Sequence, residues 1–179
     1  MGDKRIALLI SVLALCLALV ETGGKSAQTD VITRNVEAAN LWAFFQARTV
    51  RQTTVRTASE LAELQKPGTP DATGQAAIEA QQAAWRDAAA KWESEPATGE
   101  GRKELADRAR DAEARRERSL ARYHFFEYSA TLFEIGIVIA SASIVTGVPL
   151  LAAGSILLGF CGLGLGAVGF FAPQAFHLF

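Results

Sequence analysis

Cysteine and histidine are scarce in this chain of 179 residues, and neither sign of charge is in clear excess. Each of these features argues against a class of protein. The two cysteines, Cys16 and Cys161, lie in apolar stretches, where a free thiol behaves as a small hydrophobic side chain, so no disulfide is expected. The two histidines, His124 and His177, are far apart and lack spaced Cys, Asp or Glu partners, so no metal site is predicted. The net charge is −1, with 18 basic and 19 acidic residues interleaved. That balance gives no clustered basic face and predicts no nucleic-acid partner.

Sequence motifs of catalysis are also missing. The chain has no Ser–His–acid set, no nucleophile elbow and no phosphate-binding glycine loop preceded by a strand. The glycine-rich segment Gly162–Gly166 lies inside an apolar stretch and cannot cradle a phosphate. Arg48, Arg51 and Arg56 could hold anionic groups, but a solvated face that pairs with nearby acidic residues is the simpler interpretation. We therefore expect no enzyme activity and no cofactor.

The hydrophobic residues, half of the chain, concentrate in two regions. These are Ile6–Val20 and Ile135–Phe171, whereas Lys25–Arg122 is charged and rich in Ala and Gln. The first region follows Lys4 and Arg5, and its 15 residues are short for a ~30 Å hydrocarbon core at ~1.5 Å per residue. We interpret it as an uncleaved signal anchor, with a cleaved signal peptide as the alternative.

A second span is predicted over about Tyr128–Val145 and a third over about Leu150–Phe171. Thr146–Pro149 separates them, because glycine permits the turn and proline can only begin the next helix. Such a short link makes the two spans antiparallel neighbours. The expected fold is therefore an all-α membrane protein of four parts: a signal anchor or first transmembrane helix (residues 1–24), an extramembrane helical domain (25–127), a second transmembrane helix (128–148), and a third with the C-terminal tail (149–179).

The third span carries a seam of small residues at helix-packing spacing. Steps of four, three, four, three and four residues separate Ser155, Gly159, Gly162, Gly166, Gly169 and Pro173. In lipid, helices gain little hydrophobic free energy by associating, so small residues that allow a close backbone approach favour packing. The second span, itself rich in small residues, is the natural partner. The alternative is that the glycines only relieve crowding.

Two carboxylates accompany the second span. Glu127 and Glu134 are seven residues apart and share a helix face. Glu134 lies about six residues, or roughly 9 Å, into the predicted span, where an ionisable group is costly unless it is paired or hydrated. Interfacial hydrogen bonding and an ion or proton pathway are both interpretations of this site.

Three helices are predicted between the first and second spans. The first, over about Thr29–Gln65, includes Leu41–Phe45, which is apolar on all sides, so Trp42 and Phe45 should be covered by the hairpin partner or by a neighbouring subunit. An apolar line along this helix consists of Ile32, Val36, Ala39, Ala43, Ala47, Val50, Leu61 and Leu64.

The next two helices follow two loops of turn-forming composition. After the first loop, Asp71 or Thr73 can cap a helix in which Ile78, Trp85 and Trp92 lie seven residues apart, a spacing typical of coiled-coil-like packing. After the second loop, Lys103–Arg122 forms a charged helix that can continue without a break into the second span.

Two segments carry a family resemblance. They are Leu41–Arg48 (LWAFFQAR), with Arg51 and Gln52 after it, and Trp92–Leu105 (WESEPATGEGRKEL). Both resemble signatures of a bacterial membrane-protein family catalogued as a domain of unknown function, and the similarity extends through the terminal pair of spans. This chain has Phe where relatives often show Tyr in the first segment, and its N-terminal tail is short. The resemblance implies an integral membrane protein made of helices. It implies no activity.

The sequence thus predicts a small membrane protein that self-associates by helix packing and serves as a scaffold or accessory subunit. An oligomeric pore or ion/proton conduit with Glu134 at its entrance is the alternative. The expected partners are membrane lipids, further copies of the chain and a larger membrane complex. Lys4 and Arg5 favour a cytoplasmic N-terminus in the cytoplasmic (inner) membrane and hence a periplasmic large domain, whereas the arginines of residues 108–122 favour the opposite orientation.

Overall fold

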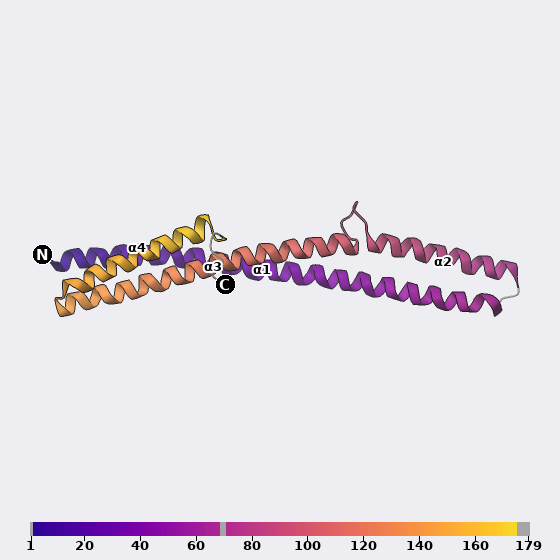
Figure 1. The fold of residues 1–179 in the computed structure, drawn as a ribbon, viewed down its shortest axis with the longest axis horizontal. Helices are drawn as coiled ribbons and strands as arrows, with labels where there is room; N and C mark the ends of the chain where they lie inside the picture. The colour runs from indigo at the N-terminus through magenta and orange to yellow at the C-terminus, as the bar shows by residue number, and fades with distance from the viewer. Residues whose placement is uncertain (1, 69–70, 175–179) are drawn as a thin grey trace. The chain divides into compact units, whose positions relative to one another are not determined.

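A computed structural model describes residues 2–68 and 71–174 (Figure 1). Its elements are α1 (Gly2–Gln65), the 3₁₀ turn η1 (Lys66–Gly68), α2 (Ala72–Glu93), α3 (Arg102–Thr146) and α4 (Pro149–Phe171). Three of these helices, α1, α3 and α4, are long and apolar enough to cross a membrane. No strand occurs within the described residues. The predicted all-α class with three spanning helices is confirmed.

α1 is a single helix of 64 residues, where the sequence suggested an anchor followed by a separate helix. Gly23 and Gly24 lie inside it, although glycine in a helix interior costs about 1 kcal/mol relative to alanine. The reason is a ring that occupies the space beside them. A Cβ added at Gly23 would lie 3.1 Å from Cζ of Phe126 on α3, so glycine here makes room for packing and does not end the helix.

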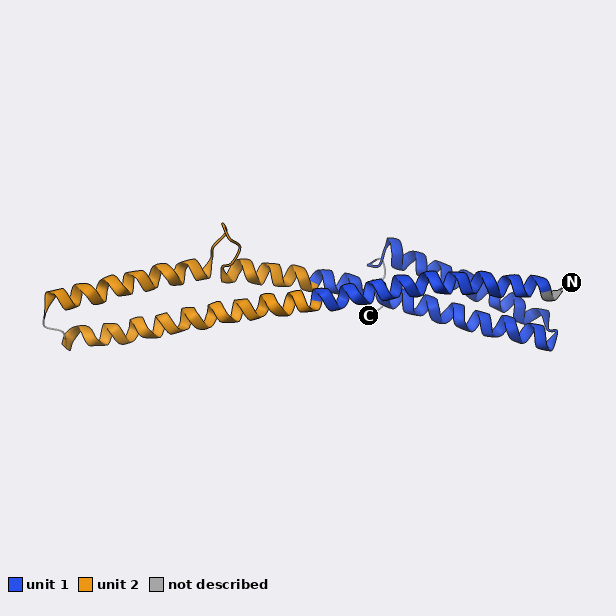
Figure 2. Ribbon diagram, turned by 180° about the vertical axis from the view of Figure 1, so that it is seen from behind, with its two compact units in different colours: residues 1–34, 114–179 blue, residues 35–113 orange. Residues whose placement is uncertain are grey.

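The chain divides into two compact units (Figure 2). Unit 1 comprises residues 1–34 and 114–179, and unit 2 comprises residues 35–113. α1 and α3 each contribute to both units, α4 belongs to unit 1 and α2 to unit 2. The predicted borders at residues 24 and 127 refer to the membrane surface and stay predictions.

The turns use the residues that the sequence suggested. Gly147 adopts a φ of +69° between α3 and α4, a left-handed conformation that glycine tolerates, and Pro149 is the first residue of α4. The hydroxyl of Ser143 donates to the Val148 carbonyl across this turn (2.9 Å). At the start of α2, Asp71 is the cap, and its carboxylate accepts from the backbone N–H of Thr73 (3.2 Å).

In unit 2, one stripe of α1 packs and the opposite face does not. The buried and half-buried positions step alternately by three and four residues through Ala38, Leu41, Phe45, Arg48, Gln52, Val55, Ser59 and Ala62. This is the spacing of a helix that packs along a single stripe. The apolar line identified in the sequence, from Val36 through Ala43 and Val50 to Leu64, is exposed. Alanine fits on either a buried or an exposed face of a helix, so the repeat of alanines in the sequence did not identify the buried face of α1.

Candidate functional site

In unit 1 the small-residue seam of α4 faces two other helices of the same chain. The buried residues of α4 are Ser155, Gly159, Gly162, Gly166 and Gly169. A Cβ added at Gly159 would lie 2.7 Å from Cδ2 of Leu13 on α1, and one at Gly162 would lie 3.2 Å from the Phe133 ring of α3. The seam is therefore filled within the chain. Pro173 lies beyond the end of α4 and is half-buried.

Two buried hydroxyls tie α3 and α4 together along this seam. Ser155 donates to the Gly136 carbonyl (2.8 Å), and Ser129 donates to the Gly162 carbonyl (2.6 Å). Each bond links a helix to the backbone of its neighbour, where absent side chains allow the approach. The second span is indeed the partner of the seam, but α1 shares that role.

Glu134 lies on α3 at about the level of Leu13 of α1. Leu13 is the central residue of the apolar stretch Ile6–Val20, and its side chain lies against Gly136 and Gly159. Glu134 precedes Gly136 by two residues, which is about 3 Å along a helix. The predicted depth of about 9 Å from the membrane surface stays a prediction.

Both carboxylates of the α3 span point away from the packed interior. Glu127 is exposed, accepts weakly from the Tyr123 hydroxyl (3.5 Å) and lies 3.6 Å from Nδ1 of His124. Glu134 is also exposed and makes no hydrogen bond or ion pair with the part of the chain that the structure describes. His177 lies outside the described residues.

The residues predicted for domain packing, four aromatic side chains and one isoleucine, are all half-buried in unit 2: Trp42, Phe45, Ile78, Trp85 and Trp92. The Trp42 and Phe45 rings meet edge to face at 5.4 Å, and Trp42 Nε1 donates to the Glu113 carboxylate (2.8 Å). They pack against a core formed by α1 and α3: Ala38, Leu41, Leu105, Ala109 and Ala112. Their cover in the chain is thus α3 and not only the hairpin partner α2.

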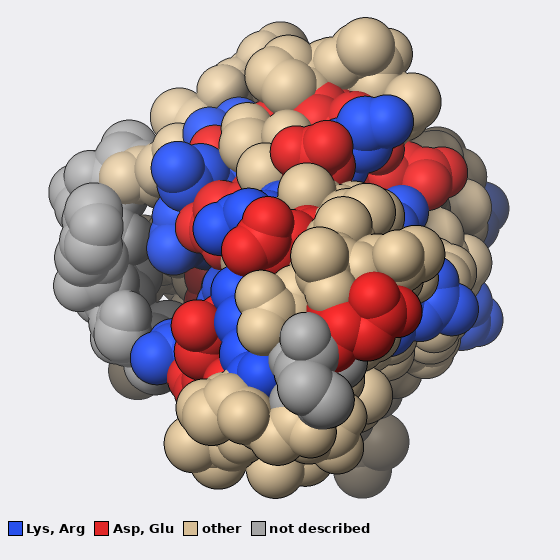
Figure 3. Space-filling view, turned by 90° about the vertical axis from the view of Figure 1, so that its right-hand side faces the viewer, with Lys and Arg blue, Asp and Glu red and all other residues tan. Residues whose placement is uncertain are grey.

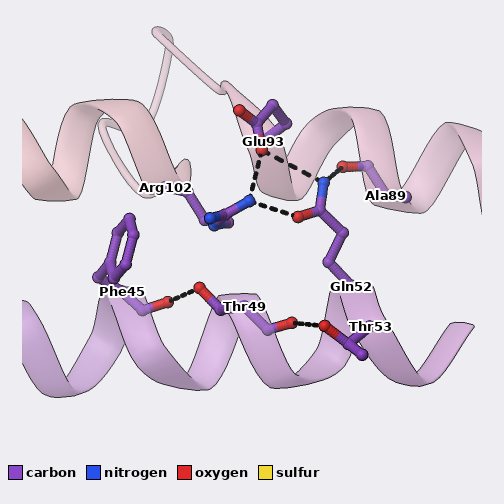
Figure 4. A network of polar contacts seen from close by, with 7 residues as sticks. All are labelled: Phe45, Thr49, Gln52, Thr53, Ala89, Glu93 and Arg102. Carbon is purple, nitrogen blue, oxygen red and sulfur yellow. Dashed lines mark hydrogen bonds and ion pairs between the residues drawn. The ribbon is translucent and has the colours of Figure 1, made fainter. Parts of the chain in front are cut away.

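The two segments that carry the family resemblance meet at one junction in unit 2 (Figure 4). Arg102, at the start of α3, donates to the Gln52 side-chain oxygen (2.6 Å) on α1 and to the Glu93 carboxylate (2.8 Å) on α2. Its guanidinium lies 5.0 Å from the centroid of the Phe45 ring, a favourable cation–π arrangement. Gln52 in turn donates to Glu93 and to the Ala89 carbonyl (3.3 Å each). Arg102, at the start of α3, is therefore joined to the end of α2 and to the body of α1.

The loop between α2 and α3 is held at both ends. The Ser94 hydroxyl and the Glu95 backbone N–H donate to the Glu104 carboxylate (2.5 and 3.2 Å). Glu100 forms an ion pair with Arg48 of α1 (2.8 Å). Sequence motifs of catalysis did not point to this junction, and the two segments that carry the family resemblance were the available signal.

An open groove of about 540 Å³ lies beside the junction. Residues of α1 and α2, together with Arg102, line it, and they include Trp85, Arg56 and Glu93. The residues that the structure describes contain no group of three or more His, Cys, Asp or Glu placed to hold a metal ion. The interactions at this junction are helix packing, hydrogen bonds and ion pairs.

Acid should loosen the loop through Glu104. The Ser94 hydroxyl, and then backbone N–H donors, hold the pKa of Glu104 below its ordinary value of 4.5. A lowered folded-state pKa means that this stabilisation is complete above the ordinary value and is lost as the pH falls through the folded-state pKa. We expect the unfolding temperature of the wild type to fall more than that of Glu104→Gln between neutral pH and about pH 3. Thermal unfolding followed by circular dichroism measures both unfolding temperatures. An identical pH dependence in the two proteins would show that the Glu104 carboxylate does not stabilise the loop.

Comparison with known proteins places nearly the whole chain in one family. The family model described as a domain of unknown function (DUF4337) matches residues 2–172. No curated protein and no solved structure matches the chain.

Proposed function

The chain belongs to the DUF4337 family, a domain of unknown function, and from that premise we propose that it is a small integral membrane protein that self-associates through helix packing. Its role in this proposal is that of a scaffold or accessory subunit of a membrane assembly, without catalytic activity or a cofactor. Because the seam of α4 is occupied by α1 and α3 of the same chain, the association uses another surface.

The observation that carries this proposal is an exposed apolar face in unit 2. We call it the outer face of α1; it consists of Val36, Ala39, Ala43, Phe44, Ala47, Val50, Thr54, Thr57, Leu61 and Leu64. Val50 and Leu64 are 64% and 78% exposed. Lipid explains exposed apolar residues on spanning helices, but unit 2 carries charges throughout α2 and the start of α3. A long apolar patch on such a surface is typical of a protein interface.

Charge also supports a second copy as the occupant. The residues that form the outer face are uncharged over 29 positions of helix, about 42 Å at the helical rise, and the exposed Arg51, between Ala47 and Thr54, is a charged neighbour at its edge. On the face of the molecule that Figure 3 shows, acidic and basic side chains are intermixed. Copies inserted in one membrane in the same orientation would align in parallel, so each residue would meet its own counterpart. A charge there would face its own sign, and the uncharged composition suits that pairing.

We expect Ala47→Glu and, separately, Leu61→Glu to weaken self-association by more than about tenfold, because like charges then face each other across the interface. Ala90→Glu is the matched control, since Ala90 is an exposed alanine of α2. Native mass spectrometry and sedimentation in detergent, over a range of concentrations, measure the change. A strictly monomeric wild type, or full association of both outer-face variants, would overturn the proposal.

The conduit alternative depends on the same assembly. Glu134 lies on the outside of its own helix bundle, so only several copies together could enclose it in a pathway. The three candidate spans support membrane association, and we place the protein in the cytoplasmic membrane. Lys4 and Arg5 keep the N-terminus inside in this proposal, with unit 2 on the periplasmic side.

A further inference from the structure

Glu134 belongs to a polar stripe on the outside of the α3 span. Steps of four, three, four, three and four residues connect Glu127, Thr131, Glu134, Val138, Ser141 and Val145, and all six are exposed. This alternation is the spacing of a helix that packs along one stripe. The exposed large residues of α4 are apolar by comparison, among them Leu150, Leu157 and Phe160.

The hydroxyl groups of this stripe form hydrogen bonds within α3, but the carboxyl group of Glu134 does not. Thr131 donates to the Glu127 carbonyl (3.0 Å) and Ser141 to the Ile137 carbonyl (2.8 Å). Glu134 makes no such contact with the described chain, although it lies on α3 at about the level of Leu13 of α1. An ionisable side chain facing lipid within a span costs several kcal/mol, and such residues normally face a partner.

We propose that a second copy of this chain covers the stripe and that the two Glu134 carboxyls pair with each other inside the membrane. A carboxyl that holds a proton both donates and accepts hydrogen bonds, so two facing carboxyls sharing protons satisfy each other. Neither α4 nor the apolar stretch Ile6–Val20 contains an Asp, Glu, Lys, Arg or His. The second copy's own Glu134 is therefore the matching group that this chain can supply.

Parallel pairing gives this contact its register. Two copies inserted with the same orientation bring each stripe residue against its counterpart, so Val138 and Val145 meet their counterparts on either side of Ser141. The inference rests on the self-association proposed above but uses a different surface, because the outer face of α1 lies in unit 2 and this stripe lies in unit 1.

Cysteine crosslinking in membranes tests the proposal. In a Cys16→Ser, Cys161→Ser background, Val138→Cys should form a disulfide-linked dimer, whereas Leu157→Cys should not. The two positions are a matched pair, 67% and 66% exposed on different helices. Adding Glu134→Leu to Val138→Cys should lower the dimer yield about three- to tenfold, the range that polar contacts between membrane helices give. Glu134→Gln, which still donates and accepts hydrogen bonds, should retain most of the yield.

Three results would overturn it: no dimer with Val138→Cys, a yield unaffected by Glu134→Leu, or a crosslinked product whose mass is not twice that of the chain. Repeating the experiment with Ala47→Glu separates the two interfaces. A Val138→Cys dimer that persists there supports the membrane contact even where the outer face of α1 fails as an interface. Loss of the Val138→Cys dimer in an otherwise associating protein defeats this inference alone.

Discussion

Leucine at both Gly162 and Gly166 is expected to break the three-helix packing of unit 1. A Cβ at Gly162 would already lie 3.2 Å from the Phe133 ring, and one at Gly166 would lie 3.1 Å from Oγ of Ser129. Overpacking costs about 1–3 kcal/mol per site, and three further carbon atoms at each position must find space between helices. We expect a combined loss of about 2–6 kcal/mol, measured as faster amide hydrogen exchange along α4 in detergent.

The same helix offers its own control for this experiment. Gly154 and Gly164 have nothing within 4 Å of an added Cβ, so Gly154→Leu with Gly164→Leu adds equal volume where it projects from the bundle. Hydrogen exchange along α4 should then match the wild type. If the seam variant also exchanges like the wild type, close glycine contact does not organise unit 1.

The contrast between these glycines shows what the sequence could and could not provide. Steps of three and four residues distinguish Gly162 and Gly166 from Gly154 and Gly164, and the seam residues are the ones that α4 buries. The residues that contact the seam were harder to predict from the sequence. Leu13 meets Gly159 only because α1 and α4 are adjacent in space, and no local pattern in Ile6–Val20 reveals that neighbour.

The extent of α1 was missed for a related reason. Gly23 and Gly24 resemble a helix end in isolation, and only the ring of Phe126, about a hundred residues away, explains why the helix continues. The helix break before Pro149, in contrast, depends on local backbone geometry, and the sequence located it.

Unit 2 shows the same division between local and distant causes. The tryptophans of α2 were recognisable by their spacing, whereas the Arg102 junction was not. Arg102 looks like one more charge on a charged helix, and its roles come from Gln52 and Glu93, which the fold brings together. Gln82 is a further case: it is a buried residue of α2 and donates to the Ser59 carbonyl of α1 (2.9 Å). Polar residues inside a packing stripe look like surface residues until their partners are known.

Gly101→Ala is expected to be the most damaging single methyl group in unit 2. Its Cβ would lie 2.5 Å from the Glu95 nitrogen and 2.7 Å from the Ser94 Cα, and it would also press on the Glu104 carboxylate. The first two contacts are backbone atoms, so the loop must open, and opening it breaks the bonds from Ser94 and Glu95 to Glu104. We expect a loss of about 3 kcal/mol in the free energy of unfolding, followed by tryptophan fluorescence because all three tryptophans lie in unit 2.

Two other glycines calibrate that result. Gly99→Ala meets little steric obstruction, but Gly99 has a φ of +69°, so strain of about 1–2 kcal/mol is expected. Gly68→Ala has open space and an ordinary φ, and it should unfold like the wild type. The expected loss of stability thus decreases from Gly101 to Gly99 to Gly68. Crowding causes it at Gly101, backbone strain causes it at Gly99, and neither acts at Gly68. A Gly101→Ala protein as stable as Gly68→Ala would show that the α2–α3 loop does not have this closed form.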